Sequence, residues 1–472
     1  MSGTGLSING KTVGVVGAGM TGRAVAEAVA RLGGRVVVAD SRSPDEAPPE
    51  AEAALATVAS EVHWSDARPL ASTDLVVLSP GIGLGDPFLD PVHAASVEVI
   101  GEVELAYRLR PDATLVGITG TNGKSTTTAL TGAMLDHSGL PARVCGNIGS
   151  PLITHVLDAE GDPVFVVELS SFQLESCTRA RMRSAALLNV SDDHADRHPT
   201  LAEYLATKAR IFGNQTQEDT AVLGADCPVA SGLASSIARA RLLWFSAVDR
   251  VAPGAYLRQG GLWIESPGAD PALVLSIDEM ALAGIHNIRN ACAAICLAHS
   301  RGATMDGMAE ALRATRSGRH TFETVGVAGG VTWINDSKGT NVDSTLMALE
   351  SCPGPVVLIA GGSEKGADYS TLGPAMAAKC RAVVTLGDTG PAIEAEARRA
   401  GLSAIHRCSG MAEAVARAAG LAQEGDRVLL SPASASFGLF RNYAHRGEAF
   451  EEAVRGLDGF VPSGATRGEA SG

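Results

Sequence analysis

The chain has 472 residues, 45% of them hydrophobic and 19% charged, so we expect a folded globular protein of about two to four domains. Its net charge of −14 argues against nucleic-acid binding, because most of the surface would repel a polyanion. The eight cysteines include no CxxC pair, which indicates neither a zinc finger nor a disulfide scaffold. The polar N-terminus and the lack of a long apolar run predict a cytoplasmic protein without membrane insertion.

Short β-branched segments alternate with Ala-rich segments along most of the chain, which predicts α/β domains with mostly parallel sheets. We expect strands in three series, at 12–16, 35–39 and 75–78, then at 114–118, 164–167 and 185–189, then near 331–334 and at 356–360, 382–386 and 428–430. We therefore predict a Rossmann-like N-terminal domain over 1–110, a central domain with a phosphate-loop sheet over 111–317, and a Rossmann-like C-terminal domain over 318–472. Residues after about Pro462 are expected to form a loose tail.

A first glycine loop, Gly17-Ala18-Gly19-Met20-Thr21-Gly22, lies between an expected strand and an expected helix, and Asp40 ends the next strand. Glycines let a backbone approach a pyrophosphate at a helix N-terminus, and Asp40 would then accept bonds from a ribose. By itself the loop favours a nicotinamide-dependent dehydrogenase, and a tight turn without a ligand is the alternative. Ser79-Pro80-Gly81 follows another strand of this domain and would face the same crevice.

A second glycine loop, within GITGTNGKST, follows the strand expected at 114–118 and precedes a helix. In a phosphate loop, backbone N–H groups hold the phosphates, the lysine neutralises their charge and the following hydroxyl binds magnesium. Ile118 stands where the strict pattern has glycine, which indicates a distinct class of phosphate loop. A glycine turn with a solvated lysine is the alternative. We interpret the loop as an ATP site formed by Gly120, Thr121, Asn122, Gly123, Lys124, Ser125 and Thr126.

Glu168 and His194 lie at or after the ends of the next two expected strands. Glu168 ends the strand at 164–167, where a carboxylate beside a phosphate loop would bind magnesium, although it would also suit a helix N-cap. His194 follows the strand at 185–189 and is a candidate ligand of a second metal, although a single histidine is more often a surface or packed residue. Lys208 lies in an expected helix and is interpreted, from composition alone, as a solvated lysine.

These segments, taken together, resemble the Mur ligases of peptidoglycan synthesis over nearly the whole chain, and within that family the branch that adds D-glutamate. The matching segments are GITGTNGKST, GNIGSPL, ELSSFQLE, NVSDDHADRH, YLATKARIF, GIHNIRNACAA, WINDSKGTNVDST and LLSPASASFGLFRNYAHRGEAF. The resemblance implies an amide ligase that uses ATP to activate the carboxylate of UDP-N-acetylmuramoyl-L-alanine as an acyl phosphate and joins it to D-glutamate. It also implies a monomer that uses two Mg²⁺ ions.

The resemblance assigns roles to individual residues. The metal ligands would be Ser125, Glu168, His194 and a Lys208 that carbon dioxide has carbamylated. Lys124, Lys338 and Thr340 would lie near the reacting groups, and the adenine nucleotide would be held by Asn287, Asn290 and Asp336. The nucleotide-sugar substrate would contact Thr21, Asp40, Arg42, Ser79, Gly81, Asn147, Ser170 and Gln173, and the incoming glutamate would contact Lys365, Ser436 and Tyr443.

Two positions depart from the family pattern. Thr321 stands where His-Arg-x-Glu has its arginine, and Arg319 is the nearest substitute. Gly438 stands where Ser-x-Asp-x-Phe has its carboxylate. Other hypotheses are a ligase that adds a different amino acid such as L-glutamate, a folylpolyglutamate synthetase, an NAD-dependent oxidoreductase, and a nucleotide-dependent protein without catalysis.

Overall fold

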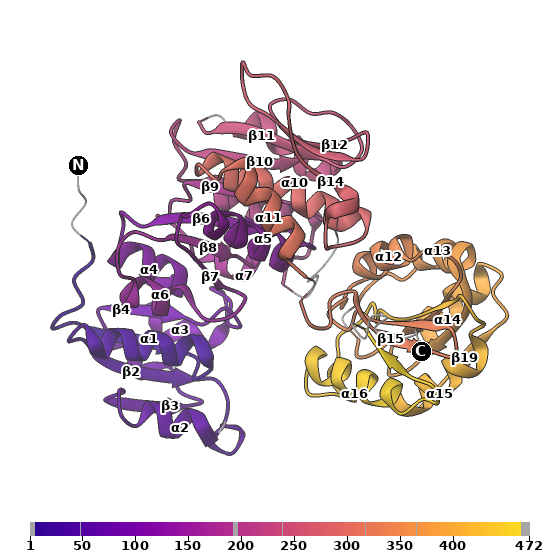
Figure 1. Cartoon of the computed structure of the whole chain (residues 1–472). Coiled ribbons are helices and arrows are strands. Elements are labelled where there is room, and N and C mark those ends of the chain that lie inside the picture. The colour runs from indigo at the N-terminus through magenta and orange to yellow at the C-terminus, as the bar shows by residue number, and fades with distance from the viewer. Residues whose placement is uncertain are drawn as a thin grey trace, which may run out of the picture. The chain divides into compact units, whose positions relative to one another are not determined.

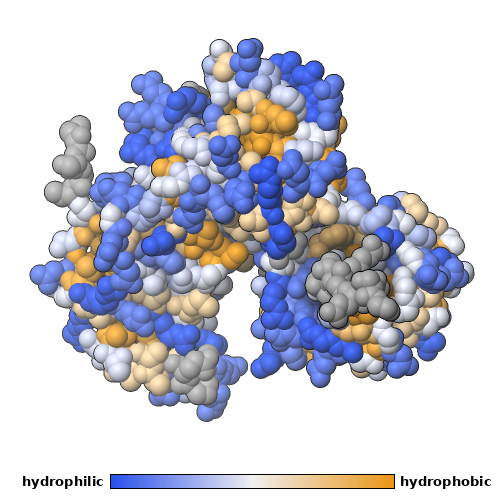
Figure 2. Space-filling view, viewed as in Figure 1, coloured by the Kyte–Doolittle hydropathy of each residue, from blue (hydrophilic) through white to orange (hydrophobic). Residues whose placement is uncertain are grey.

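The computed structural model describes residues 5–47, 49–191, 197–237, 239–316, 318–364 and 366–463, apart from the side chains of residues 49 and 50. The chain divides into two compact units, one built mainly from residues up to Thr315 and the other mainly from residues from Arg316 onward. Helices and strands alternate through both units (Figure 1). Hydrophilic and hydrophobic residues are interspersed over the face shown in Figure 2. Among the described helices, none has both the length and the apolar composition needed to cross a membrane.

The N-terminal sheet is parallel, with the strand order β3-β2-β1-β4-β5. The order reverses between β1 and β4, which is where ligands bind in open α/β sheets. Its elements are β1 (Thr12–Val16), α1 (Met20–Arg31), β2 (Arg35–Asp40), α2 (Pro49–Leu55), β3 (Glu61–Trp64), β4 (Leu75–Leu78), α3 (Asp90–Ala94), β5 (Val99–Gly101) and α4 (Glu102–Leu109).

The central sheet has the order β14-β13-β12-β11-β10-β9-β6-β8-β7, and it is parallel from β12 to β7. Its elements are β6 (Thr114–Thr119), α5 (Lys124–His137), β7 (Ala142–Gly146), α6 (Leu152–Asp158), β8 (Val164–Glu168), α7 (Ser171–Glu175), β9 (Ser184–Leu187), α8 (Leu201–Ala209), β10 (Thr220–Gly224), α9 (Pro228–Ser231), β11 (Arg241–Ser246), β12 (Gly254–Arg258), β13 (Gly261–Glu265), β14 (Ala272–Ser276), α10 (Ile285–Ser300) and α11 (Met305–Ala314).

The C-terminal sheet has the order β19-β18-β17-β20-β16-β15-β21, with antiparallel pairing only at the β16-β15-β21 end of the described strands. Its elements are β15 (Glu323–Ala328), β16 (Val331–Asn335), α12 (Val342–Ser351), β17 (Val356–Ala360), α13 (Leu372–Lys379), β18 (Cys380–Thr385), α14 (Gly390–Arg399), β19 (Ile405–Arg407), α15 (Met411–Leu421), β20 (Arg427–Leu430), α16 (Tyr443–Arg455) and β21 (Val461–Pro462).

The predicted α/β class with mostly parallel sheets is confirmed, and each of the three sheets belongs to one expected domain. The boundaries expected near residues 110 and 318 stay predictions. Several strand predictions need correction. Strand β9 ends at Leu187 rather than at residue 189, and strands β3, β5, β7, β10, β11, β19 and β21 were not expected. The third series begins at β15, before residue 331, and the antiparallel strands β12 to β14 were not expected. The β12–β13 hairpin turns on Gln259 and Gly260, both with positive φ, which is a two-residue turn with a weak sequence signature.

Candidate functional site

The carboxyl ends of four neighbouring parallel strands of the central sheet bring the predicted nucleotide-site residues together. The phosphate loop follows β6, Glu168 is the last residue of β8, Asn147 follows β7 and Asn189 follows β9. Glu168 pairs in register with Ile118, at the end of the strand that enters the loop. Parallel strands present their carboxyl ends at one edge, so this arrangement follows directly from the strand order.

The phosphate loop owes its shape to two glycines. Gly120 has φ of +158° and Gly123 has φ of +84°, and both values lie outside the range that other residues adopt easily. A Cβ at Gly123 would lie 2.2 Å from the Oδ1 of Asn290, so glycine is also required for space, and Asn290 lies directly against the loop. Helix α5 begins at Lys124, directly after Gly123, so the positive end of its dipole faces the loop.

The side chain of Lys124 folds over the loop. Its Nζ donates to the carbonyl oxygens of Gly120, at 2.9 Å, and Thr121, at 2.7 Å. A phosphate entering the loop would offer stronger, charged acceptors to the same ammonium group. Ser125 and Thr126 are half-buried in the first turn of α5.

Glu168 is suited to binding a metal ion. It is 2% exposed, and its Oε1 accepts from the Nδ2 of Asn147 at 2.8 Å. Its Oε2 is enclosed and has no hydrogen-bond partner among the described residues. Together with the hydroxyl of Ser125 this provides the hard oxygen donors that Mg²⁺ prefers, so the residues present fit that ion.

The N-cap interpretation of Glu168 is wrong. Helix α7 is capped by Ser170, whose Oγ accepts from the N–H of Gln173 at 3.2 Å, while the Oε1 of Gln173 accepts from the N–H of Ser170 at 3.0 Å. These two predicted substrate-binding side chains therefore also hold each other in a capping box.

Lys208 is buried and faces the phosphate loop. It is 1% exposed, its Nζ donates to the carbonyl oxygen of Gly120 at 2.9 Å, and it lies 4.4 Å from the ring centre of Tyr204. The interpretation as a solvated lysine is therefore wrong, because periodicity could not show that this face of α8 packs against the loop. The carbonyl of Gly120 accepts from both Lys124 and Lys208.

Two predicted site residues, His194 and Lys365, lie outside the described residues. Asn287 and Asn290 are both on α10 and both buried, and the Nδ2 of Asn287 donates to the carbonyl oxygen of Ala283 at 2.7 Å.

In the N-terminal sheet, the carboxylate of Asp40 is hydrogen-bonded to the glycine loop and to Arg42. Its Oδ1 accepts from the N–H and Nε of Arg42, and its Oδ2 accepts from the N–H of Ala18 and the Nη2 of Arg42. Burial disfavours the charged carboxylate, but these bonds outweigh it and hold the pKa of Asp40 at about 2. A carboxylate has about four acceptor positions, so the ribose of a nicotinamide or a uridine nucleotide would have to displace one of these donors. The predicted contact of Asp40 with a nucleotide stays a prediction.

Ser79, another predicted residue of this sheet, packs against the same loop. Gly17 has φ of +96°, and a Cβ at that position would lie 2.7 Å from the Oγ of Ser79. A Cβ at Gly22 would lie 1.7 Å from the carbonyl oxygen of Gly17, so helix α1 and the loop pack too closely for any other residue. Thr21 is half-buried in the first turn of α1, and Gly81 is exposed.

The C-terminal sheet gathers a second set of predicted residues after β16 and β20. Asp336 follows β16, and its carboxylate accepts from the N–H of Phe322 at 3.0 Å and from the Oγ of Ser431 at 2.8 Å. Burial outweighs these bonds and raises the pKa of Asp336 to about 7. Lys338 and Thr340 follow in the same loop and are half-buried.

Arg446, which the sequence analysis did not single out although it lies in the terminal HRGEAF segment, holds together two loops that carry predicted site residues. It is fully buried and donates to the Oγ and carbonyl oxygen of Ser337 and to the carbonyl oxygens of Ser434 and Ala435. Burial lowers the pKa of Arg446 to about 10. It thus ties the loop after β16 to the loop that carries Ser436, which is buried, while Tyr443 is 40% exposed at the start of α16.

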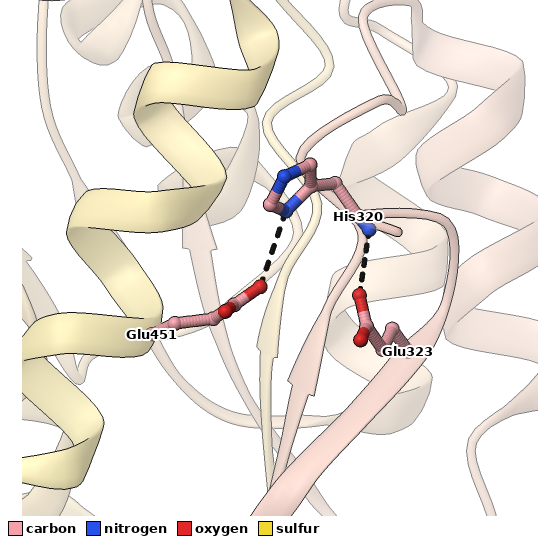
Figure 3. A group of neighbouring side chains, drawn as sticks. All are labelled: His320, Glu323 and Glu451. Carbon is pink, nitrogen blue, oxygen red and sulfur yellow. Dashed lines mark hydrogen bonds and ion pairs between the residues drawn. The ribbon is translucent and has the colours of Figure 1, made fainter. Parts of the chain in front are cut away.

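His320, Glu323 and Glu451 lie close together in the C-terminal unit, in an arrangement that resembles a metal site (Figure 3). The Oε2 of Glu323 accepts from the N–H of His320 at 2.7 Å, and the Nδ1 of His320 lies 3.2 Å from the Oε1 of Glu451. The Nδ2 of Asn335 lies 2.9 Å from that Nδ1 and 3.0 Å from that Oε1. Its amide orientation is fixed, because its Oδ1 accepts from the N–H of Ser337. The amide nitrogen of Asn335, a neutral donor, therefore occupies the position between His320 and Glu451 that a cation would need.

Two arginines supply the positive charge that this cluster needs. Arg319 and Arg455 donate to the Oε2 of Glu451, at 3.3 Å and 2.8 Å. The group therefore does not fit a metal ion and instead holds the turn in which His320 and Phe322 have positive φ. Arg319 is the nearest substitute for the arginine that the family has at position 321, and it pairs with the carboxylate of Glu451.

Comparison with known proteins agrees with this arrangement. Family models match three successive parts of the chain: the Mur ligase MurD-like N-terminal domain at residues 11–101, the Mur ligase middle domain at 118–298 and the Mur ligase glutamate ligase domain at 318–434. The UDP-N-acetylmuramoylalanine--D-glutamate ligase of Pelotomaculum thermopropionicum is 41% identical over 95% of this chain and 98% of its own length. The enzyme of the same name from Myxococcus xanthus is 42% identical over 96% of this chain and 100% of its own length.

Solved structures share the fold. The UDP-N-acetylmuramate-alanine ligase MurC of Thermotoga maritima matches with a TM-score of 0.59 at 18% identity, over 94% of this chain and 99% of that one. The MurF ligase of Thermotoga maritima, in complex with ADP, matches with a TM-score of 0.59 at 17% identity, over 89% and 95%. The predicted resemblance is confirmed: this chain belongs to the Mur ligase family.

Proposed function

We propose that the protein joins the amine of D-glutamate to the alanyl carboxylate of UDP-N-acetylmuramoyl-L-alanine, converting ATP to ADP and phosphate. The relatives that match almost the full chain carry this activity in their names. The observation that supports it most is the phosphate loop, with Glu168 at the end of the neighbouring strand β8 and the buried Lys208 bonded to Gly120. An acyl-transfer enzyme of the serine type would not need such a loop.

The chemistry needs two anions, the substrate carboxylate and the γ-phosphate, to meet. The ammonium group of Lys124 and the N-terminus of α5 offset the negative charge of the phosphates. The carboxylate then attacks the γ-phosphorus in line, ADP leaves, and an acyl phosphate forms. The neutral amine of glutamate attacks the acyl carbon, phosphate leaves with the electrons of the C–O bond, and the nitrogen releases a proton to the departing phosphate or to water. Positioning and charge compensation account for such a reaction, so no enzyme nucleophile is required.

Ser434 and Ser436 are better explained as parts of a binding surface than as nucleophiles. The Oγ of Ser434 lies 2.8 Å from the Oγ1 of Thr389 and 3.0 Å from the hydroxyl of Tyr369. Neither hydroxyl is a general base at neutral pH, so this serine has no means of activation there.

Two Mg²⁺ ions are part of the proposal, with Ser125, Glu168, His194 and Lys208 as their ligands. When bound, Mg²⁺ would neutralise phosphate charge. Lys208 would serve as a ligand only after carbamylation, which needs a neutral amine, and burial favours the neutral form of a lysine. A ¹³C carbamate signal that appears with ¹³CO₂ in the intact protein, and is lost in Lys208→Arg, would test this. We further propose a cytoplasmic monomer.

The decisive experiment is phosphate release with UDP-N-acetylmuramoyl-L-alanine and ATP, with D-glutamate, L-glutamate or no amino acid. We expect release and a new amide product only with D-glutamate. Product with L-glutamate alone would favour the related ligase, and ATP binding without release under any condition would favour a non-catalytic protein. Lys124→Ala should abolish release, whereas Lys11→Ala, at the start of the N-terminal sheet, should leave it unchanged. Normal turnover by Lys124→Ala would contradict the ATP site.

A further inference from the structure

Asn189 makes a set of contacts to the phosphate loop that none of the predicted roles explains. Its carbonyl oxygen accepts from the N–H of Thr121 at 3.0 Å. Its side-chain Oδ1 accepts from the N–H of Asn122 at 2.8 Å, and its Nδ2 donates to the carbonyl oxygen of Asn122 at 3.1 Å. One residue therefore binds two consecutive residues of the loop through three hydrogen bonds.

The backbone around Asn189 also packs tightly against the start of the loop. A Cβ at Gly120 would lie 3.0 Å from the Cβ of Leu188 and 3.3 Å from the backbone nitrogen of Asn189. Strand β9 ends at Leu187, two residues before the strand end expected from the sequence, so Asn189 is already outside the ladder and free to bond the loop. The segment after β9 therefore lies against the loop from Gly120 to Asn122.

These bonds fix the first part of the phosphate loop. The N–H groups of Thr121 and Asn122 donate to Asn189, so these bonds fix the backbone of both residues. The chain then bends at Gly123, with φ of +84°, into the first turn of α5. A loop shaped before its ligand arrives binds it more tightly, because less ordering is needed on binding.

We propose that Asn189 is a positioning residue that preshapes the phosphate loop for a nucleoside triphosphate. This inference rests on the proposed function only in taking the loop as the ATP site. The role requires an amide, because the side chain must accept from one backbone group and donate to another. Aspartate would keep the acceptor, lose the donor and place a negative charge beside the phosphates. Alanine would lose both side-chain bonds.

The test is calorimetric binding of a non-hydrolysable ATP analogue to the full-length protein. Asn189→Ala should weaken binding about tenfold to a hundredfold, because two hydrogen bonds that order the loop are lost. Asn189→Asp should weaken it at least as much. In turnover, the KM for ATP should rise while the KM values for the other two substrates stay unchanged, a split that general destabilisation would not produce.

The matched control is Asn214→Ala. Asn214 also bonds two backbone groups with its amide, the carbonyl oxygens of Thr178 and Ala180 at 3.0 and 3.1 Å, but away from the phosphate loop. The Asn214→Ala substitution should leave the affinity for the ATP analogue unchanged even if it lowers the melting temperature of the protein.

Wild-type affinity in a folded Asn189→Ala protein would overturn the inference. If that variant does not fold, the affinity of Asn189→Asp, which preserves the side-chain size, is measured instead. Wild-type affinity in that variant would likewise overturn the inference. A wild-type protein that binds the analogue but forms no product with D-glutamate would refute the proposed function and leave the inference about Asn189 standing. A wild-type protein that does not bind the analogue would overturn both.

Discussion

Replacing Glu102 with glutamine should stabilise the protein at neutral pH. Glu102 is the first residue of α4 and is 3% exposed. Its Oε1 accepts from the N–H of Ile153 at 2.6 Å, in the first turn of α6, whereas its Oε2 is enclosed without a hydrogen-bond partner among the described residues. Burial dominates over that single bond and raises the pKa of Glu102 from 4.5 to about 7.

The raised pKa of Glu102 determines how its contribution to stability changes with pH. A carboxyl group whose pKa is raised on folding contributes its full stability below the unfolded pKa, near 4.5, and loses that stability as the pH rises through about 7. The whole difference corresponds to about 3 kcal/mol, because one pKa unit is about 1.4 kcal/mol. Glutamine is neutral at every pH, and its amide oxygen still accepts from Ile153. The advantage of Glu102→Gln should therefore grow by about 2 to 3 kcal/mol between pH 5 and pH 8.

Glu104, two residues further along the same helix, is a control of opposite sign. It is also buried, but Arg108 and the N–H groups of residues 178–180 donate to its carboxylate. Burial opposes its ionisation, yet these bonds prevail and lower the pKa of Glu104. Glu104 therefore contributes stability above its unfolded pKa and loses that contribution as the pH falls. Glu104→Gln should thus destabilise the protein at pH 8.

The assay is urea unfolding followed by circular dichroism at several pH values from 5 to 8, for the wild type and both variants. Parallel stability profiles for the wild type and Glu102→Gln would refute the reasoning, because they would mean that Glu102 is charged in the folded protein at no cost. A stabilised Glu104→Gln would refute the assignment of its hydrogen bonds.

Two further substitutions have matched controls within the chain. Gly123→Ala should abolish binding of an ATP analogue, because its Cβ would lie 2.2 Å from Asn290, whereas Gly139→Ala has a similar positive φ but open space and should bind the analogue normally, as calorimetry would show. Arg446→Met should lower the free energy of unfolding by about 3 to 5 kcal/mol, since it leaves buried carbonyl groups unpaired, whereas Arg399→Met on the exposed side of α14 should cost below about 1 kcal/mol. Equal urea midpoints for the two arginine variants would contradict the first value.

The sequence by itself determined the features that depend on neighbours along the chain. The alternation of β-branched and Ala-rich segments predicted the α/β sheets, and GTNGKS predicted a glycine loop between β6 and α5. The place of Glu168 at the end of a strand also followed from local pattern. Hairpin β12–β13 and strand β15 escaped prediction, because their short, glycine-containing segments carry little periodicity.

The tertiary structure decided what each polar side chain meets. Lys208 has the pattern of a surface lysine, yet it is buried because α8 packs against the phosphate loop. Glu102 and Glu104 differ only in position on one helix, but their pKa values shift in opposite directions because different donors surround them. Asn189 gains its contacts from a loop that lies 67 residues earlier in the chain. Desolvation and hydrogen bonding depend on which distant segments come together, and only the folded chain brings them together.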